Sequence, residues 1–246
     1  GTLTSGCAQP KLPVRPAAVA GQFYPGNKIE LNRTVETYLN ETAPRKITGE
    51  IIGILVPHAG YVYSGRVAAE AYKNIAGQQV DTIILVGLSH RYQLGETAAV
   101  YQQGFWETPL GQIKIDDDLT AELIKSNPSI KNNPPAHVTE HCLEVQIPFI
   151  QKLFPQVQIV PVLIQTTDVS ICKNVGQSIA ELIKSRPGKK ILVIGSTDMS
   201  HYPKYDDANS VDNAAIDVLR QLNPELLNQQ INRLMSKRTP QLECVF

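Results

Sequence analysis

The stretch 50-EIIGILVPHAGY-61 is an apolar run that ends in a proline and a histidine, His58. Its nearly continuous Ile, Leu and Val residues are typical of a strand that is buried on both faces of a sheet. Three further runs have the same character, at 82–88, 158–164 and 190–196. Helical patterns separate these runs. The sequence therefore predicts an α/β fold, a three-layer sandwich in which helices flank a mostly parallel central sheet.

The remaining elements follow from periodicity and from turn residues. Helical patterns cover residues 28–42, 65–75, 117–126, 139–154, 169–185, 206–222 and 224–236. Gly104, Pro109 and Gly111 interrupt residues 98–115 and favour a hairpin or an edge pair of strands. Prolines at 10, 13 and 16 predict an extended leader over residues 1–17. We expect residues 18–246 to form a single domain.

Composition excludes several classes of function. The 246 residues carry 23 basic and 23 acidic side chains, so no charge excess favours nucleic acid or an anionic membrane. No apolar run approaches the roughly 18 residues of a membrane span. The phosphate-binding patterns GxGxxG and GxxxxGK[ST] and the nucleophile elbow GxSxG are absent from the sequence.

Three histidines follow the ends of predicted strands. His58 follows the first run, His90 follows residues 82–88, and His201 follows residues 190–196. A single histidine after a strand is usually a loop residue or a hydrogen-bond partner. Because ligands bind at the carboxyl edge of open α/β sheets, three such histidines predict a shared site. Neutral imidazole binds Fe, Cu and Zn, so we expect His58 and His90 to hold a transition metal ion.

Two further pairs combine histidine with a carboxylate. Asp198 and His201 would face the same way on a helical turn, where Asp198 could ligate, orient an imidazole or transfer a proton. The alternative is that Asp198 caps the next helix. His141 and Glu144 have the same spacing on the helix predicted at 139–154, where a carboxylate could orient a ligating imidazole or act as a proton relay. The alternative is a solvated helix start with Glu140 in its first turn.

The four cysteines, Cys7, Cys142, Cys172 and Cys244, are scattered and form no CxxC pair. They indicate reduced thiols and a cytoplasmic protein. The segment 3-LTSGCAQ-9 supports an alternative, because it is similar to the end of a bacterial lipoprotein signal. In that case lipid on Cys7 would anchor the protein outside the cytoplasm.

The sequence resembles the Memo family, which is named for a mediator of cell motility and has microbial members. Six motifs stand in the family's order over residues 15–246: 20-AGQFYP-25, 57-PHAGYVYSG-65, 87-GLSH-90, 105-FWETPLG-111, 140-EHCLEVQIPF-149 and 196-STDMSHY-202. The sequence departs from the family after Cys244, where Val245 and Phe246 replace a Gly and a Pro-containing segment. We therefore expect the domain either to be truncated at its C-terminus or to have an ending that diverges from the family.

The resemblance implies a fold similar to that of class III extradiol dioxygenases. It implies a metal site formed by His58, His90 and Cys244. The surrounding catalytic residues would be His201, Asp198, His141 and Glu144, and Phe23, Tyr24, Tyr61 and Tyr63 would line a substrate pocket. Fe(II) or Cu is the expected metal, with Zn as an alternative. A thiolate ligand would shift the preference toward softer ions such as Cu(I).

Three functions are compatible with such a site. The first is a metal-dependent oxidoreductase that acts on a small molecule or a peptide. The second is a non-catalytic module that binds a peptide or a partner, because microbial family members accompany radical-SAM proteins. The third is a hydrolase that uses metal-activated water.

Overall fold

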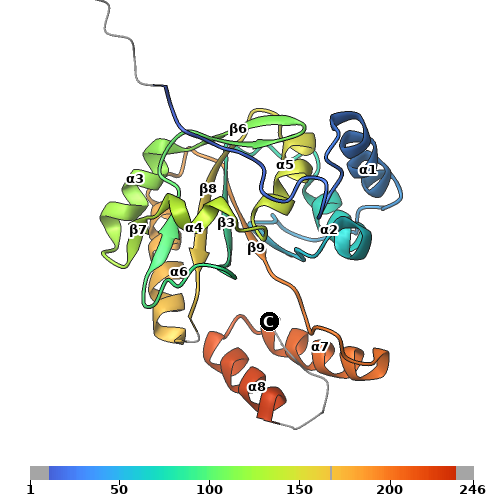
Figure 1. The fold of residues 1–246 in the computed structure, drawn as a ribbon. Coiled ribbons are helices and arrows are strands. Elements are labelled where there is room, and N and C mark those ends of the chain that lie inside the picture. The colour runs from blue at the N-terminus through green and yellow to red at the C-terminus, as the bar shows by residue number, and fades with distance from the viewer. Residues whose placement is uncertain (1–10, 167, 237–246) are drawn as a thin grey trace, which may run out of the picture.

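The computed structural model describes residues 11–166 and 168–236. A nine-stranded mixed sheet lies at its centre, with the strand order β1-β5-β6-β8-β3-β9-β2 and with β4 paired to β8 and β7 (Figure 1). The strands are β1 Val14–Arg15, β2 Gly53–Val56, β3 Thr82–Leu88, β4 Ala98–Val100, β5 Phe105–Thr108, β6 Gly111–Ile115, β7 Ile130–Asn132, β8 Gln158–Ile164 and β9 Ile191–Ser196. Among the strands of the described residues, only β4–β8 and β5–β6 pair antiparallel, so the predicted mostly parallel sheet is confirmed.

Helices cover both faces of this sheet. The helices of the described residues are α1 Lys28–Asn40, α2 Tyr61–Ile75, α3 Asp117–Ser126, α4 Pro134–Val138, α5 Ile147–Leu153, α6 Val169–Lys184, α7 Tyr205–Leu219 and α8 Pro224–Ser236, with a 3-10 turn, η1, at Glu144–Gln146. The helices α1, α2 and α5 cover one face, and α3 and α6 cover the other. The predicted helical layers on both faces are therefore confirmed.

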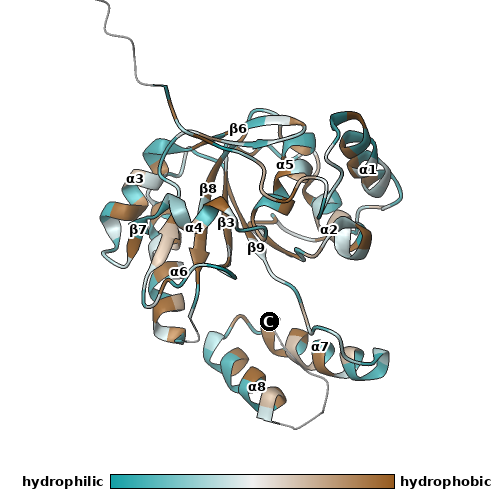
Figure 2. Cartoon of the chain, viewed as in Figure 1, coloured by the Kyte–Doolittle hydropathy of each residue, from teal (hydrophilic) through white to brown (hydrophobic). Residues whose placement is uncertain are grey.

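Alternation along the central strands divides the core between the two faces. Ile83 and Leu85 of β3 belong to the cluster beneath α1, α2 and α5, whereas Ile84 between them belongs to the cluster beneath α3 and α6. Strand β8 divides in the same way. Hydrophobic residues colour β3 and β8 brown in Figure 2. Burial on both faces explains why these strands are nearly continuous apolar runs.

The structure differs from the sequence expectation in the segment that follows α4. Residues 139–154 do not form one helix, because a turn at Cys142–Leu143 separates α4 from η1 and Pro148 lies at the start of α5. Residues 11–17 of the predicted leader include β1, which pairs with β5. The helices α7 and α8 pack on each other away from the sheet (Figure 1).

Within the described ranges, no helix combines the length and the apolar character that a membrane crossing requires. Cys7 and Cys244 lie outside these ranges.

Candidate metal centre

The site lies at the carboxyl edge of three neighbouring strands. In the order β3-β9-β2, Val56 pairs with Ser196, and Ser196 pairs with Gly87. Strands β2 and β3 flank β9, so the loops that follow them begin at the same edge of the sheet. These loops bring His58 and His90 close together. The two ring centroids are 5.2 Å apart.

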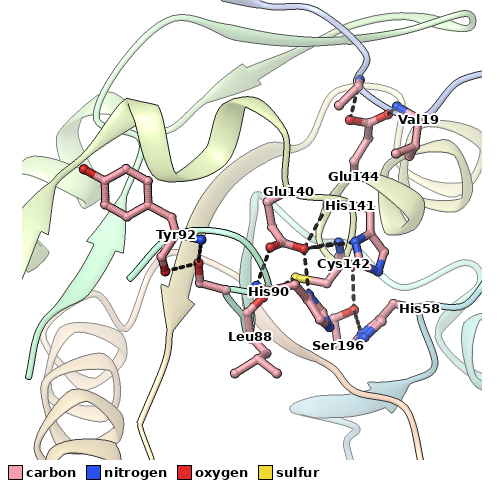
Figure 3. Close-up of polar contacts among 12 residues, drawn as sticks. Val19, His58, Leu88, His90, Tyr92, Glu140, His141, Cys142, Glu144 and Ser196 are labelled. Atoms are coloured by element: carbon pink, nitrogen blue, oxygen red, sulfur yellow. Dashed lines mark hydrogen bonds and ion pairs between the residues drawn. The ribbon is translucent and has the colours of Figure 1, made fainter. Parts of the chain in front are cut away.

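A third imidazole, that of His141, lies beside those of His58 and His90. Its ring centroid lies 4.5 Å from that of His90 and 5.5 Å from that of His58. One ring nitrogen from each of the three residues lies within 4.8 Å of the others. We call these three residues the histidine cluster (Figure 3). His201, the third histidine that the strand ends predicted, is not part of it.

Glu140 fixes the orientation of His90. Its Oε1 is 2.9 Å from Nδ1 of His90, and its Oε2 accepts from the backbone N–H of His90 at 2.7 Å. Oε1 also accepts from the backbone N–H groups of His141 and Cys142. Burial raises the pKa of Glu140, but these hydrogen bonds outweigh burial and bring it to about 2. The ionised carboxylate can only accept, so Nδ1 of His90 carries the proton and its Nε2 is free to ligate.

A second network assigns the tautomer of His58. The hydroxyl of Ser196 donates to the carbonyl of Cys142 at 2.7 Å, so its oxygen can only accept from Nδ1 of His58, 3.3 Å away. Gln146 also donates to this hydroxyl and to the carbonyl of Pro57. The proton on His58 therefore sits on Nδ1, which leaves Nε2 unprotonated.

Burial favours the neutral form of His58 and His141. It lowers the pKa of His58 below 6.5, although Asp198 partly opposes this effect. Burial likewise lowers the pKa of His141 to about 4, against the attraction of Glu140. Neutral imidazole is the form that ligates metal ions, and two of the three rings present a free Nε2. The donor set of the histidine cluster therefore fits a transition metal.

A second group of potential ligands, His90, Glu140 and Cys142, also lies within 4.8 Å. It fits a metal less well, because the Glu140 carboxylate already accepts from N–H donors on both oxygens. The Cys142 thiol donates to the carbonyl of Leu88 at 3.0 Å, and burial raises its pKa well above 9. Glu140 therefore acts as the partner that orients His90.

Asp198 connects the histidine cluster to an open cleft. Its Oδ1 accepts from the backbone N–H groups of His58 and Ala59, so it fastens the loop after β2 and does not cap a helix of its own. Its Oδ2 lies 3.6 Å from Nε2 of His58 and 3.6 Å from Nε2 of His201. Residues 197–204 are not helical, yet the predicted pair of Asp198 and His201 does meet.

The cleft has a volume of about 460 Å³. Its lining residues come from the loops after β2 and β9 and from α2: Pro57, Ala59, Tyr63, Ser64, Val67, Asp198, Met199, Ser200, His201 and Tyr202. Tyr63 and Tyr202 are largely exposed. A ligand in this cleft would contact both apolar side chains and the Asp198–His201 pair.

Other predicted site residues lie elsewhere. Glu144 points away from the histidine cluster because Arg15 pairs with its carboxylate at 2.7 Å (Figure 3). Tyr24 and Tyr61 are buried in the core, where their hydroxyls donate to Glu144 and to the carbonyl of Val145. These three side chains do not line the cleft.

Phe23 and Tyr63, the remaining aromatic residues of the predicted pocket, are placed differently. The ring of Phe23 packs 4.6 Å from that of His141, and Tyr63 lines the cleft. Cys244 lies outside the described residues. The sequence patterns did not identify Glu140 and Ser196 as orienting residues. Both residues belong to motifs that the chain shares with the Memo family, 140-EHCLEVQIPF-149 and 196-STDMSHY-202. Membership in these motifs was the only sequence feature that marked them as candidate site residues.

Gly87 is required for the loop of Glu140 and His141 to pack on β3. A Cβ at this position would lie 2.7 Å from Cδ2 of Leu143 and 2.8 Å from Sγ of Cys142. We expect Gly87→Ala to lower the free energy of unfolding by about 1–3 kcal/mol through overpacking. Gly176→Ala, in α6 with no atom within 4 Å, is the matched control and should not destabilise the protein. Urea unfolding measures both, and equal stabilities of the two variants would contradict this packing.

Comparison with known proteins identifies the family. A family model described as "Memo-like protein" matches residues 15–239. A "MEMO1 family protein" of Sulfolobus acidocaldarius is 36% identical over 222 residues, which cover 85% of this chain and 77% of the relative. Those of Ignicoccus hospitalis and Aquifex aeolicus are each 37% identical, over 88% and 87% of this chain and 79% and 77% of the relatives. The chain therefore belongs to the Memo-like family.

Proposed function

We propose that this chain binds a transition metal ion through His58 and His90, with His141 as the third imidazole at the site. The observation that carries this proposal is the histidine cluster itself, whose nitrogens lie within 4.8 Å and whose His58 and His90 each present an unprotonated Nε2. Imidazole donors suit Fe, Cu and Zn alike. We propose Fe(II) or Cu as the bound ion, with Zn as the alternative. Cys244, the ligand implied by the family resemblance, is proposed to join the same ion.

We propose further that the site serves an oxidoreductase reaction related to that of extradiol dioxygenases. A bound metal would supply a redox-active Lewis acid. The residues of the chain would do the rest: Ser196 and Glu140 orient the ligands, and the cleft binds a small molecule or a peptide beside the site. The Asp198–His201 pair, open to the cleft, is placed to take up or deliver a proton at Nε2 of His201.

The exposed tyrosines of the cleft support a second function, the binding of a peptide or a partner without catalysis. Tyr63 and Tyr202 offer amphipathic rings of the kind that protein interfaces favour. Under this proposal the metal would order the residues that line the cleft, and the site would catalyse no reaction.

An oxygen-uptake assay tests the oxidoreductase function. The protein is loaded anaerobically with Fe(II), mixed with a catechol and exposed to O₂. We expect O₂ consumption and formation of an oxidised product, both lost in the His58→Ala/His90→Ala variant because it lacks two ligands. His201→Ala should keep the metal and slow turnover. Metal retention without O₂ consumption in the wild-type chain would contradict the redox function and leave the binding function.

A further inference from the structure

A buried ion pair joins the N-terminal segment, residues 15–24, to the loop at residues 137–144. This loop carries Glu140 and His141. Nη1 of Arg15 lies 2.7 Å from Oε2 of Glu144, and both side chains are 1% exposed. Glu144 also accepts from the backbone N–H groups of Ala18 and Val19 and from the hydroxyl of Tyr24. The carboxylate therefore has partners on both of its oxygens, all of them in the N-terminal segment.

The guanidinium of Arg15 has two further contacts with this loop. Its Nε donates to the carbonyl of His137 at 2.6 Å, and its Nη2 donates to the carbonyl of Glu140 at 2.7 Å. Its plane lies over the ring of Trp106, 4.3 Å from the centroid. The planar guanidinium of Arg15 thus contacts this loop at three positions, 137, 140 and 144. Lysine cannot reproduce this arrangement, because an ammonium has neither the fork nor the stacking surface.

The backbone that Arg15 holds carries two parts of the candidate site. Between the anchored positions, the side chain of Glu140 binds His90, and His141 contributes its imidazole to the histidine cluster. From these contacts we infer that Arg15 and Glu144 are positioning residues for the metal centre: they touch no member of the histidine cluster, but they fix the loop that aims Glu140 and His141. This inference rests on the proposed metal-binding function.

Two variants test the inference, and a third serves as the control. Arg15→Lys keeps the charge but loses the fork, and Glu144→Gln keeps the shape but loses the charge. Lys189→Met breaks a different and less buried ion pair, with Asp116, at the opposite edge of the sheet. The readouts are the affinity for Co(II) alone, its visible spectrum, and amide hydrogen exchange of the metal-free protein.

We expect Arg15→Lys and Glu144→Gln to weaken Co(II) affinity by about 10–100-fold, the usual effect of losing support around metal ligands, and to change the Co(II) spectrum. In metal-free protein the amides of His90, His141 and Cys142, which donate to Glu140, should lose protection relative to the amides at the centre of β3. Lys189→Met should leave both readouts as in the wild-type chain.

Other outcomes separate the two proposals. Wild-type Co(II) affinity and wild-type amide protection in either folded variant would overturn the positioning role. Failure of both variants to fold, while Lys189→Met folds, would also overturn it and assign the pair to structure alone. If the wild-type chain binds no Co(II), the proposed function fails, but loss of protection at the three amides would still support the positioning role.

Discussion

Glu140→Gln is expected to weaken metal binding by about 10–100-fold, because it removes the carboxylate that orients His90. Three N–H donors converge on Oε1 and one on Oε2, and a carboxylate can accept all of them. Glutamine offers a single acceptor oxygen, so its amide nitrogen must face at least one of these donors. His90 would then lose the contact that keeps its Nε2 free.

Competition with a chelator measures the dissociation constant of the metal for this variant. Asp116→Asn is the matched control, because Asp116 is another buried carboxylate with several donors, from Thr82, Lys189 and Leu119. It lies at the opposite edge of the sheet and should cost stability without altering metal affinity. Equal affinities of the Glu140→Gln variant and the wild-type chain would show that Glu140 does not support the ligand.

His137→Phe is expected to reduce the loss of stability at acidic pH. The His137 ring is 0% exposed, and neither ring nitrogen has a hydrogen-bond partner in the described part of the chain. It packs edge-on against Trp106 and Tyr101, with ring centroids 5.6 Å and 6.0 Å away. Burial, together with the neighbouring Arg15 charge, lowers its pKa from 6.5 to about 3.

The direction of the effect follows from this pKa. Below pH 6.5 the unfolded chain binds a proton at His137, whereas the folded chain does not until about pH 3. The contribution of the neutral ring to stability is therefore complete above pH 6.5 and declines as the pH falls toward 3. One such group costs about 2 kcal/mol between pH 7.5 and pH 5. His58 and His141, whose pKa values are also lowered, add to the same trend.

Urea unfolding of the metal-free protein at pH 7.5 and pH 5 measures this effect. The loss of unfolding free energy between the two pH values should be smaller by about 2 kcal/mol in His137→Phe than in the wild-type chain. Tyr101→Phe is the control, because it changes the neighbouring ring and leaves the histidine in place. An unchanged pH dependence in His137→Phe would mean that His137 does not remain neutral in the folded protein.

The sequence predicted the central strands best. The ranges predicted for β3 and β8 agree with the structure. Strands buried on both faces need uninterrupted apolar residues, and such a short apolar run is typical of them. The positions of His58 and His90 after such strands predicted that they would meet at one edge. This inference required only the parallel order of β3, β9 and β2, which the structure shows.

The surroundings of the histidines were harder to predict. The spacing of His141 and Glu144 indicated a shared helical face, but a turn at Cys142–Leu143 interrupts that helix. His141 joins the histidine cluster, whereas Glu144 pairs with Arg15. Glu140, interpreted as a first-turn residue, is the carboxylate that contacts His90. Arg15 lies in the segment predicted as a leader, and its partners are more than 120 residues away in the chain. Local patterns carry no information on such long-range ion pairs.

The metal content of the protein tests the central claim most directly. The native chain and the His58→Ala/His90→Ala variant are purified anaerobically, reconstituted with Fe(II), Cu(I) or Zn(II), and measured by elemental mass spectrometry against protein concentration. The histidine cluster predicts about one ion per chain in the native protein and none in the double variant. A native chain that retains no metal after reconstitution, or a double variant that retains the same amount, would contradict the assignment of His58 and His90 as ligands.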